Sequence, residues 1–443
     1  MKLKKSISSL KLPHHKGTAS KQSERVAPPA EVLLPMNMHG GAAAVPVVSV
    51  GDYVRVGQKI GAEEGRFSVQ VHASVSGTVT AIEDYRASGR PCKAVRIASD
   101  GKMELDPSVK APKLESREDF LNALHDSGIV GLGGAAFPLY GKLDAIRNGP
   151  IHTVLVNGAE CEPFITSDHR TMLEDTDYVV KGVELLLKYL ESERVIIGIE
   201  DNKRDAIELL KQRFADNSAV EVKALKSVYP QGAKQVLLYN AAGLVTEEGQ
   251  RLASLGYIII NITTLAKMAE FIETGLPLVD RRVTVDGSAV KEPKNLIAPL
   301  GTPISYLVEN CGGLKSPAGK VISGGPMMGK TVSSMDAPVI KASNAVLIFN
   351  EKDAKLSEPS PCIHCGRCVE ICPLGLDPVG YSKAWEVEDE EKRFELLCKG
   401  KVTNCMECGC CSYVCPAHRP LAEVNGKARA FVRKKNSEKK GGR

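Results

Sequence analysis

The sequence predicts a multidomain protein of mixed α/β and α+β class. Its 443 residues leave room for two to four domains, each large enough to bury its own core. Short β segments with glycine turns come first, and from Ser116 onward strands alternate with helices, as in a domain built on a mostly parallel sheet. Most of the 13 cysteines follow, within residues 362–415. Such clustering indicates metal binding in a reducing compartment rather than a disulfide scaffold.

The two ends of the chain differ from the body in charge. Residues 1–25 hold seven Lys and Arg against one Glu, and residues 426–443 hold eight against one, so the body between them is acidic. We expect both ends to be mobile basic tails, with contact to anionic lipid or an acidic partner as the alternative. No basic stripe crosses the body, so nucleic acid is not an expected partner.

The hydropathy pattern predicts a soluble chain. No run of apolar residues approaches the roughly 18 that a membrane-spanning helix needs. The basic N-terminus also lacks the apolar segment of a secretory signal.

The first expected domain covers residues 26–110. Its short β segments contain a V-x-x-G-D-x-V-x-x-G-Q run at Val48–Gln58 and resemble the β-sandwich of lipoyl and biotinyl carrier domains. Those carriers present a lysine on a hairpin, whereas no lysine occurs here from Ile60 to Cys92. We therefore expect a lipoyl-like domain that packs or docks and carries no covalent cofactor.

A Rossmann-like α/β domain is expected over residues 111–280. Ser116 and Asp119 form a capping box that opens a helix ending near Asp126. Within this domain we expect strands at 153–157, 194–200, 220–224 and 257–260, and helices at about 170–190, 203–214 and 232–242.

Residues 281–350 are β-rich, with one short helix at about 303–311, and resemble a β-grasp module of the soluble-ligand-binding type.

The cysteine-rich segment, residues 351–425, contains the same motif twice, with a helix expected at about 380–398 between the copies. Each copy is a C-x2-C-x2-C-x3-C-P run, in which the fourth cysteine ligates the other cluster of a two-cluster ferredoxin. Structural zinc is the competing interpretation, because C-x2-C pairs also bind zinc. Cys92, Cys311, Cys398 and Cys410 are expected to be small buried hydrophobes. The motif predicts one 4Fe–4S cluster on Cys362, Cys365, Cys368 and Cys415, and a second on Cys405, Cys408, Cys411 and Cys372.

A glycine-rich loop precedes the first strand of the α/β domain. It reads Gly131-Leu132-Gly133-Gly134-Ala135-Ala136-Phe137-Pro138 and is followed by Lys142. Glycines allow close approach of main-chain N–H groups to a phosphate, and a lysine can supply the counter-charge, although such a loop can also be only a tight turn. Polar residues that end strands lie at the edge where open α/β sheets bind ligands. Here they are Asn157 to Phe164, Tyr229 to Gly232 and Asn261 to Thr264.

The order of these features resembles the C subunit of the Rnf membrane complex over nearly the whole chain. The carrying motifs are the glycine loop, V-N-G-A-E-C-E-P, Y-P-Q-G, Gly324-Gly325-Pro326-Met327-Met328-Gly329 and the paired cysteine runs. The α/β and β-grasp parts are also similar to the FMN- and NADH-binding subunit of respiratory complex I. The chain departs from complex I at Leu132, where complex I has Arg, at Ala159, where it has Asp, and at Ala233-Lys234, where it has two Glu.

The resemblance implies non-covalent FMN, NAD(H) stacked against it, and two 4Fe–4S clusters that relay single electrons. It implies no catalytic side chain of its own. By position, Phe137 and Glu162 would meet the nicotinamide nucleotide. The residues implied to surround FMN are Gly131, Gly133, Gly134, Lys142, Asn157, Glu160, Tyr229, Gly232, Asn261 and Thr264.

The implied function is that of a peripheral member of an ion-translocating ferredoxin:NAD⁺ oxidoreductase on the cytoplasmic face of the cell membrane. Its partners would be the other subunits of a membrane-embedded electron-transport complex, with electrons arriving from ferredoxin through one of them. Two alternatives stay open. One is an NADH-dependent corrinoid reductase of a bacterial microcompartment, and the other is a flavin-free iron–sulfur adaptor that only conducts electrons.

Overall fold

The computed structural model describes residues 8–87, 90–144 and 149–441. Two small antiparallel sheets form the N-terminal sandwich, in the strand orders β2-β8-β7-β4 and β3-β5-β6. Gly77 begins β7, and a Cβ atom there would lie 1.9 Å from the carbonyl oxygen of Ala98 on β8, so only glycine fits this pairing. The strands are β2 (Glu31–Pro35), β3 (Val45–Pro46), β4 (Tyr53–Val54), β5 (Lys59–Ala62), β6 (Val71–His72), β7 (Gly77–Ala87) and β8 (Arg90–Ser99).

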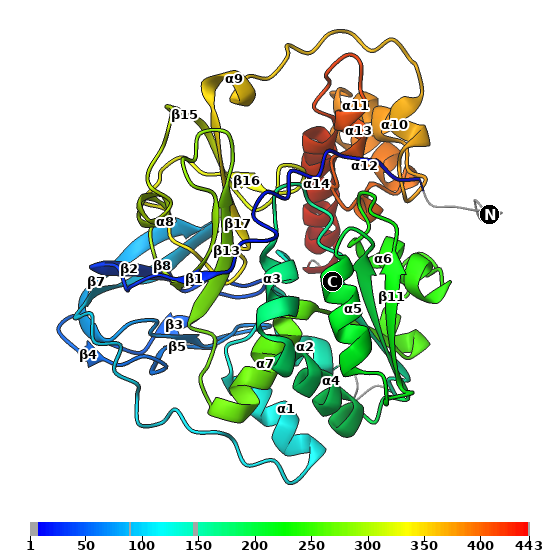
Figure 1. The fold of residues 1–443 in the computed structure, drawn as a ribbon. Coiled ribbons are helices and arrows are strands. Elements are labelled where there is room, and N and C mark those ends of the chain that lie inside the picture. The colour runs from blue at the N-terminus through cyan, green and yellow to red at the C-terminus, as the bar shows by residue number, and fades with distance from the viewer. Residues whose placement is uncertain (1–7, 88–89, 145–148, 442–443) are drawn as a thin grey trace.

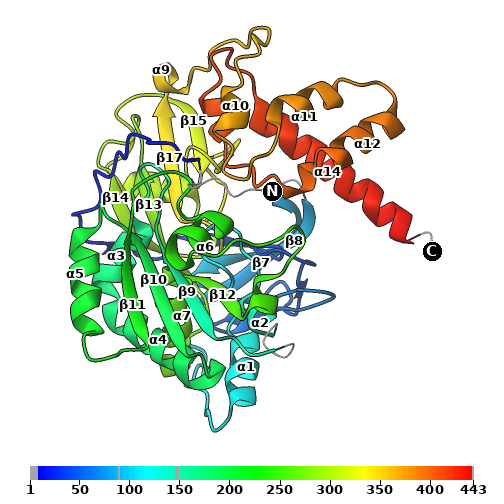
Figure 2. The same cartoon turned by 90° about the vertical axis from the view of Figure 1, so that its right-hand side faces the viewer.

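The α/β domain has a sheet of order β11-β10-β9-β12, in which every pairing is parallel (Figure 2). The carboxyl ends of the strands therefore meet at one edge. The strands are β9 (Thr153–Gly158), β10 (Arg194–Glu200), β11 (Val220–Leu225) and β12 (Tyr257–Asn261). The helices are α1 (Arg117–Asp126), α2 (Leu139–Leu143), α3 (Ser167–Glu174), α4 (Thr176–Leu190), α5 (Arg204–Arg213), α6 (Lys234–Ala242) and α7 (Ile262–Thr274).

The predicted capping box at the start of α1 is confirmed, but the single helix predicted at 170–190 is wrong. The helix is interrupted at Asp175, which separates α3 from α4. At the break, the guanidinium of Arg282 donates hydrogen bonds to Asp175 Oδ2 at 2.6 Å and to Glu174 Oε2 at 3.0 Å. The break is thus stabilised by a residue of another domain.

The third unit is a mixed six-stranded sheet of order β1-β14-β13-β17-β15-β16 with α8 beside it (Figure 1). Its edge strand β1 comes from the N-terminal segment and pairs parallel to β14. The elements are β1 (Glu24–Arg25), β13 (Asp280–Asp286), β14 (Lys294–Pro299), α8 (Ile304–Asn310), β15 (Ala318–Ser323), β16 (Lys330–Thr331) and β17 (Ala345–Asn350).

The C-terminal unit is helical, and its last helix extends away from the body (Figure 2). The helix predicted at 380–398 is wrong, because Asp389 accepts a hydrogen bond from the Lys392 N–H at 2.8 Å and starts a new helix there. No helix in the described ranges is long and apolar enough to cross a membrane. The helices are α9 (Glu351–Ala354), α10 (Arg367–Glu370), α11 (Pro378–Trp385), α12 (Glu390–Lys399), α13 (Cys410–Tyr413) and α14 (Leu421–Gly441).

The prediction of two mobile basic tails is wrong wherever the ends are described. Residues 421–441 form α14, which buries Ala428 and Val432 against α11 and α12. Residues 8–25 form a strap along the body, drawn in dark blue in Figure 1, from a β-bridge between Leu10 and Tyr229 to the Arg25–Asp280 ion pair at 2.7 Å. Residues 1–7 of the N-terminal tail lie outside the described residues.

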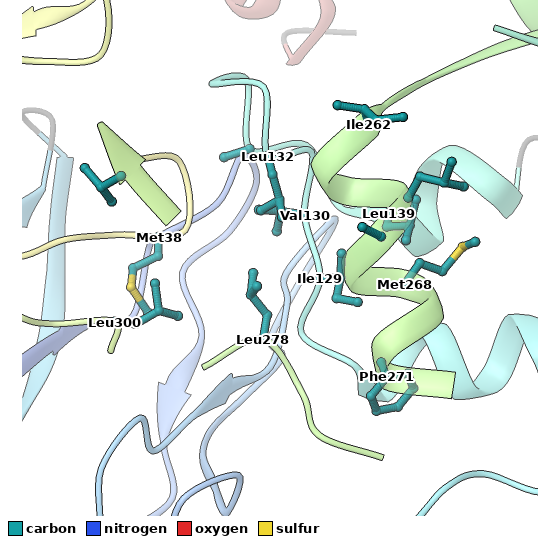
Figure 3. Close-up of a cluster of buried hydrophobic side chains, with 14 of the residues drawn as sticks. Met38, Ile129, Val130, Leu132, Leu139, Ile262, Met268, Phe271, Leu278 and Leu300 are labelled. Atoms are coloured by element: carbon teal, nitrogen blue, oxygen red, sulfur yellow. The ribbon is translucent and has the colours of Figure 1, made fainter. Parts of the chain in front are cut away.

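A hydrophobic core beneath the glycine-rich loop joins the first three units (Figure 3). The sandwich contributes Met38, the chain entering the loop contributes Val130, and the loop itself contributes Leu132. Helix α7 adds Met268, and the third unit adds Leu300. The glycine-rich loop is therefore mounted on packed side chains from several parts of the chain.

Lys341 lies at the same junction and is fully buried. Its Nζ donates hydrogen bonds to the carbonyls of Gln70 in the sandwich and Gly128 in the α/β domain, both at 2.7 Å. Burial lowers the pKa of Lys341 to about 7, because an ammonium loses its hydration there.

The Lys341→Met variant should lose a pH-dependent part of the stability. Between a folded-state pKa of about 7 and an unfolded-state pKa of about 10.4, the unfolded chain binds a proton that the folded chain lacks. The unfolding free energy of the wild type therefore gains about 1 kcal/mol per pH unit from Lys341 in that window, and the variant does not. Urea unfolding midpoints at pH 7, 8 and 9 measure the difference. The exposed Lys226→Met serves as control, and parallel curves for Lys341→Met and wild type would contradict the prediction.

Candidate functional site

The glycine-rich loop is clamped at Leu132 and open at its tip. The Leu132 N–H donates to Thr264 Oγ1 at 2.8 Å, and Arg281 Nη2 donates to the Leu132 carbonyl at 3.0 Å. Gly134 has φ +100, and a Cβ atom there would meet nothing within 4 Å. Gly133 has an ordinary φ, but its Cβ would lie 3.3 Å from the Asn261 side chain, so Gly133 is needed for space and Gly134 for conformation.

A buried polar network lies under this loop. Asn261 caps α7 by accepting a hydrogen bond from the Thr264 N–H at 3.1 Å and donates from Nδ2 to Asp168 Oδ2 at 2.7 Å. Thr263 donates to the other carboxylate oxygen of Asp168 at 2.6 Å. Burial raises the pKa of Asp168, while these two donors oppose the rise. Asn261 and Thr264 therefore position the loop and α7, whatever ligand they also contact.

Lys142 lies on α2, and its Nζ donates to the carbonyl of Ile259 on β12 at 2.8 Å. Burial, and to a smaller extent the nearby cation Lys234 at the start of α6, lowers the pKa of Lys142 to about 8. Phe137, at the other end of the loop, has its ring 5.1 Å from that of Phe67 in the sandwich.

The turn after β9 carries Glu160 and Glu162, the two carboxylates predicted for the site. Glu160 accepts hydrogen bonds from the N–H groups of Asp168 at 2.5 Å and His169 at 3.1 Å, at the start of α3. Glu162 accepts from the N–H groups of Met327 at 3.0 Å and Met328 at 2.9 Å. Burial raises the pKa of Glu162 to about 7, and it also raises that of Glu160. Both side chains are engaged by main-chain amides, so their assignment to FMN and nucleotide stays a prediction.

Tyr229 connects the α/β domain to the cysteine-rich unit. Its hydroxyl donates to the carbonyl of Cys408 at 2.7 Å, and its side chain packs with Leu10 and Cys410. Nearby, the Asn157 amide donates to the Gly232 carbonyl at 3.0 Å. The predicted flavin residues Asn157 and Gly232 therefore lie side by side, whereas Tyr229 reaches past them to the second cysteine run.

Five cysteines from both runs line one cavity. Cys372 of the first run faces it together with Cys405, Cys408, Cys410 and Cys411 of the second. Main-chain N–H groups donate to two of these sulfurs, from Leu376 to Cys372 and from Glu407 to Cys405, each at 3.4 Å. Four of the five, Cys372, Cys405, Cys408 and Cys411, are the predicted ligands of one cluster and can supply the thiolates that a 4Fe–4S cubane needs. Their assignment as a ligand set stays a prediction.

The other half repeats the same backbone. His364 and Glu407 have φ +54 and +57, and Gly366 and Gly409 have φ +76 and +78. Cys415 raises the pKa of Cys368 in addition to the larger effect of burial, which indicates that Cys415 lies near the first run. Among the described residues, no three His, Cys, Asp or Glu side chains form a group that could hold a single metal ion.

The remaining cysteines do not all fit the prediction. Cys311 and Cys410 are buried as expected, but Cys398 is exposed and Cys92 only half-buried. Cys398 lies on α12, whose only buried side chain is Leu397. It is therefore not a core residue.

Sequence reasoning missed three site residues. Arg281 clamps the glycine loop, Asp168 organises the network beneath it, and Lys16 donates to three carbonyls of the turn after β9. A cue for Asp168 was its place just before the helix expected at about 170–190, because acidic residues are frequent where helices begin. Arg281 and Lys16 act on main-chain carbonyls far away in sequence and carry no local cue.

Comparisons with known families divide the chain in the same order. A family model for the RnfC barrel sandwich hybrid domain matches residues 5–102, and one for the Nuo51 FMN-binding domain matches residues 124–270. Models for the SLBB domain and the 4Fe–4S dicluster domain match residues 282–331 and 361–418. These matches confirm the predicted fold class and indicate FMN and 4Fe–4S clusters as cofactors.

Among solved structures, an NAD⁺-reducing [NiFe]-hydrogenase in the H₂-reduced state is similar with a TM-score of 0.50 and 16% identity. The similarity covers 72% of this chain and 63% of the hydrogenase chain, and it concerns the fold alone.

Relatives that match about four fifths of the chain are more similar to it in sequence than this hydrogenase is. The chain is 42% identical to the C subunit of the Na⁺-translocating ferredoxin:NAD⁺ oxidoreductase complex of Acetobacterium woodii, over 80% of this chain and 81% of the relative. It is 40% identical to the proton-translocating counterpart of Clostridium ljungdahlii, over 82% and 80%. The C subunit of an ion-translocating oxidoreductase complex of Rhodobacter capsulatus is 34% identical, over 82% and 72%. The chain therefore belongs to the family of C subunits of ion-translocating ferredoxin:NAD⁺ oxidoreductase (Rnf) complexes.

Proposed function

We propose that the chain exchanges hydride with NAD(H) at FMN and relays single electrons through two 4Fe–4S clusters to a partner subunit. The observation that carries the proposal is the hydrogen bond from Tyr229 to the Cys408 carbonyl at 2.7 Å, because it joins the edge of the α/β sheet to a proposed cluster loop. The complex would receive electrons from ferredoxin through another of its subunits. The chain would lie peripherally on the cytoplasmic face of the membrane.

FMN would bind at the exposed tip of the glycine-rich loop. The space beside Gly134 and the main-chain N–H groups of the tip suit a phosphate, and Lys142 and Lys234 supply positive charge nearby. When bound, the flavin accepts two electrons as hydride and releases them one at a time. Gly131, Gly133, Asn157, Glu160, Gly232, Asn261 and Thr264 would surround it, and Phe137 and Glu162 would meet the nicotinamide nucleotide.

The two proposed clusters would act in a fixed order. Cys408 is buried where the second run meets Tyr229, whereas Cys365 of the first run is exposed. Electrons would therefore pass between the flavin and the cluster of Cys405, Cys408, Cys411 and Cys372. They would leave or enter the chain at the cluster of Cys362, Cys365, Cys368 and Cys415.

The proposed domains are residues 26–110, 111–280, 281–350 and 351–425. The strap and helix α14 belong to this assembly as structural parts, because both are packed on it.

The function is tested by purifying the chain without oxygen and analysing its cofactors. We expect roughly one FMN released by acid and about eight irons per chain, since each of two cubanes holds four. NADH should reduce an artificial dye through the flavin. Clusters without flavin would contradict the proposal and favour an adaptor that only conducts electrons.

The Cys415→Ser variant should damage the cluster of the first cysteine run, although Cys415 lies in the second. The reason is the crossed ligation in which each fourth cysteine serves the other cluster. Electron paramagnetic resonance of the reduced chain should lose the signal of one cluster, and the same signal should be lost in Cys362→Ser. The exposed Cys398→Ser is the matched control and should keep both signals. Loss of the signal shared with Cys405→Ser would show that the ligation is not crossed.

The Gly133→Val variant should lose FMN while keeping its iron. A side chain at this position meets Asn261 at 3.3 to 3.4 Å, so it displaces the residue that caps α7 and binds Asp168. Gly133→Ala, with a single methyl group, should show a smaller loss. The flavin released by acid and the iron content of the purified variants provide the measurement. A full flavin content in Gly133→Val would place the FMN site elsewhere.

A further inference from the structure

The turn from Glu160 to Ile165 is held by a residue far away in the sequence. Lys16 Nζ donates to the carbonyls of Glu160 at 2.9 Å, Glu162 at 2.8 Å and Ile165 at 2.5 Å. An ammonium carries three donors and no acceptor, so these three carbonyls use its full capacity. Lys16 lies outside residues 124–270, the range that matches the FMN-binding domain.

The turn has a conformation that needs such support. Glu160 has φ +52 and Phe164 has φ +70, and both are non-glycine residues in the left-handed region. Side chains make this region unfavourable, so the surroundings have to stabilise it. The carbonyls that converge on Lys16 belong to one of these residues and to the segment that follows it.

The strap on both sides of Lys16 is attached to the same turn. The Phe164 N–H donates to the His14 carbonyl at 2.9 Å, and the His15 ring stacks on the Phe164 ring at 4.7 Å. After Lys16, the Thr18 and Thr166 hydroxyls hydrogen-bond at 2.6 Å. Lys16 is therefore placed by its neighbours and does not reach the turn as a free side chain.

The charge of Lys16 is matched to this position. Burial lowers its pKa, and the carboxylate of Glu160 acts in the opposite direction. Lys203 donates to the carbonyl of Ala159 at 2.7 Å, so a second lysine holds the residue before the turn. A neutral side chain of similar length in place of Lys16 would leave three carbonyls without their donor.

We propose that Lys16 is a positioning residue for cofactor and nucleotide binding at the sheet edge. By fixing the main chain of residues 160–165 it places Glu162, whose carboxylate binds the amides of Met327 and Met328. The strap thereby sets the distance between the turn and the Gly324–Gly329 loop. This inference rests on the proposed function, because it assumes that FMN and NAD(H) bind at this edge.

The test compares Lys16→Met with Lys21→Met. Met has a similar length but no donor, and Lys21 is an exposed strap residue whose Nζ donates to the Pro293 carbonyl at 2.8 Å, away from the turn. Hydrogen bonds from a charged group justify an expected loss of about tenfold or more. We expect Lys16→Met to weaken FMN binding, measured by fluorescence quenching of FMN added to flavin-depleted chain, and to raise the KM for NADH by about that factor. Its iron content should equal that of wild type, and Lys21→Met should behave like wild type in every measurement.

The outcomes separate this inference from the proposed function. If wild type itself binds no FMN, the proposed function fails. If wild type binds FMN and Lys16→Met has the same FMN affinity and NADH KM, only the role of Lys16 fails. Equal losses in Lys21→Met would show that the strap stabilises the chain in general and would overturn the specific role. Should Lys16→Met not fold, Lys16→Arg decides. Arg keeps the charge, but its planar guanidinium cannot donate hydrogen bonds to three carbonyls that converge on one point. An unchanged KM for NADH in that variant would therefore contradict the proposal.

Discussion

Strands β9 to β12 run parallel, so their carboxyl ends meet at one edge, and every other part of the chain that contributes to the site has to reach that edge. The sandwich contacts Phe137 through Phe67, and the six-stranded unit binds Glu162 through main-chain amides. The strap holds the turn after β9, and the cysteine-rich unit meets Tyr229. The edge of one small sheet therefore constrains where each of the other units can lie.

The charges at this edge are stabilised largely by main-chain dipoles. Lys16 donates to carbonyls of the α/β domain, Lys203 donates to the Ala159 carbonyl of its own domain, and Glu160 and Glu162 accept from amides. Lys341 donates to carbonyls of two other units at the junction beneath the glycine-rich loop. A buried charge is costly unless such groups surround it, and the groups are in place only when the loops have their native conformation. Burial accordingly lowers the pKa of Lys16 and Lys341 and raises the pKa of Glu160 and Glu162. Each of these residues thus makes the position of a loop depend on another part of the chain.

Local signals in the sequence were enough to predict much of the fold. Apolar β-branched runs predicted the strand at 194–200 with its observed bounds, and the capping box predicted α1. The break at Asp175 could not be predicted, because it involves Arg282, more than one hundred residues away. For the site, glycine and cysteine spacing identified the loops, but Lys16 was assigned to a mobile tail because its acceptors are carbonyls, which leave no trace in composition.

The two cysteine runs show how identical local geometry can produce different sites. Their backbones share the same left-handed residues, so each run by itself would present its thiolates in the same way. Their surroundings differ, because Cys408 and Cys411 are buried and the Asn425 amide lies 4.0 Å from Cys411 Sγ, whereas Cys365 is exposed. Cluster potentials depend on solvent exposure and on hydrogen bonds to the sulfurs. The two copies of the motif therefore differ in their surroundings, and the Tyr229 hydroxyl donates its hydrogen bond to Cys408 of the second copy.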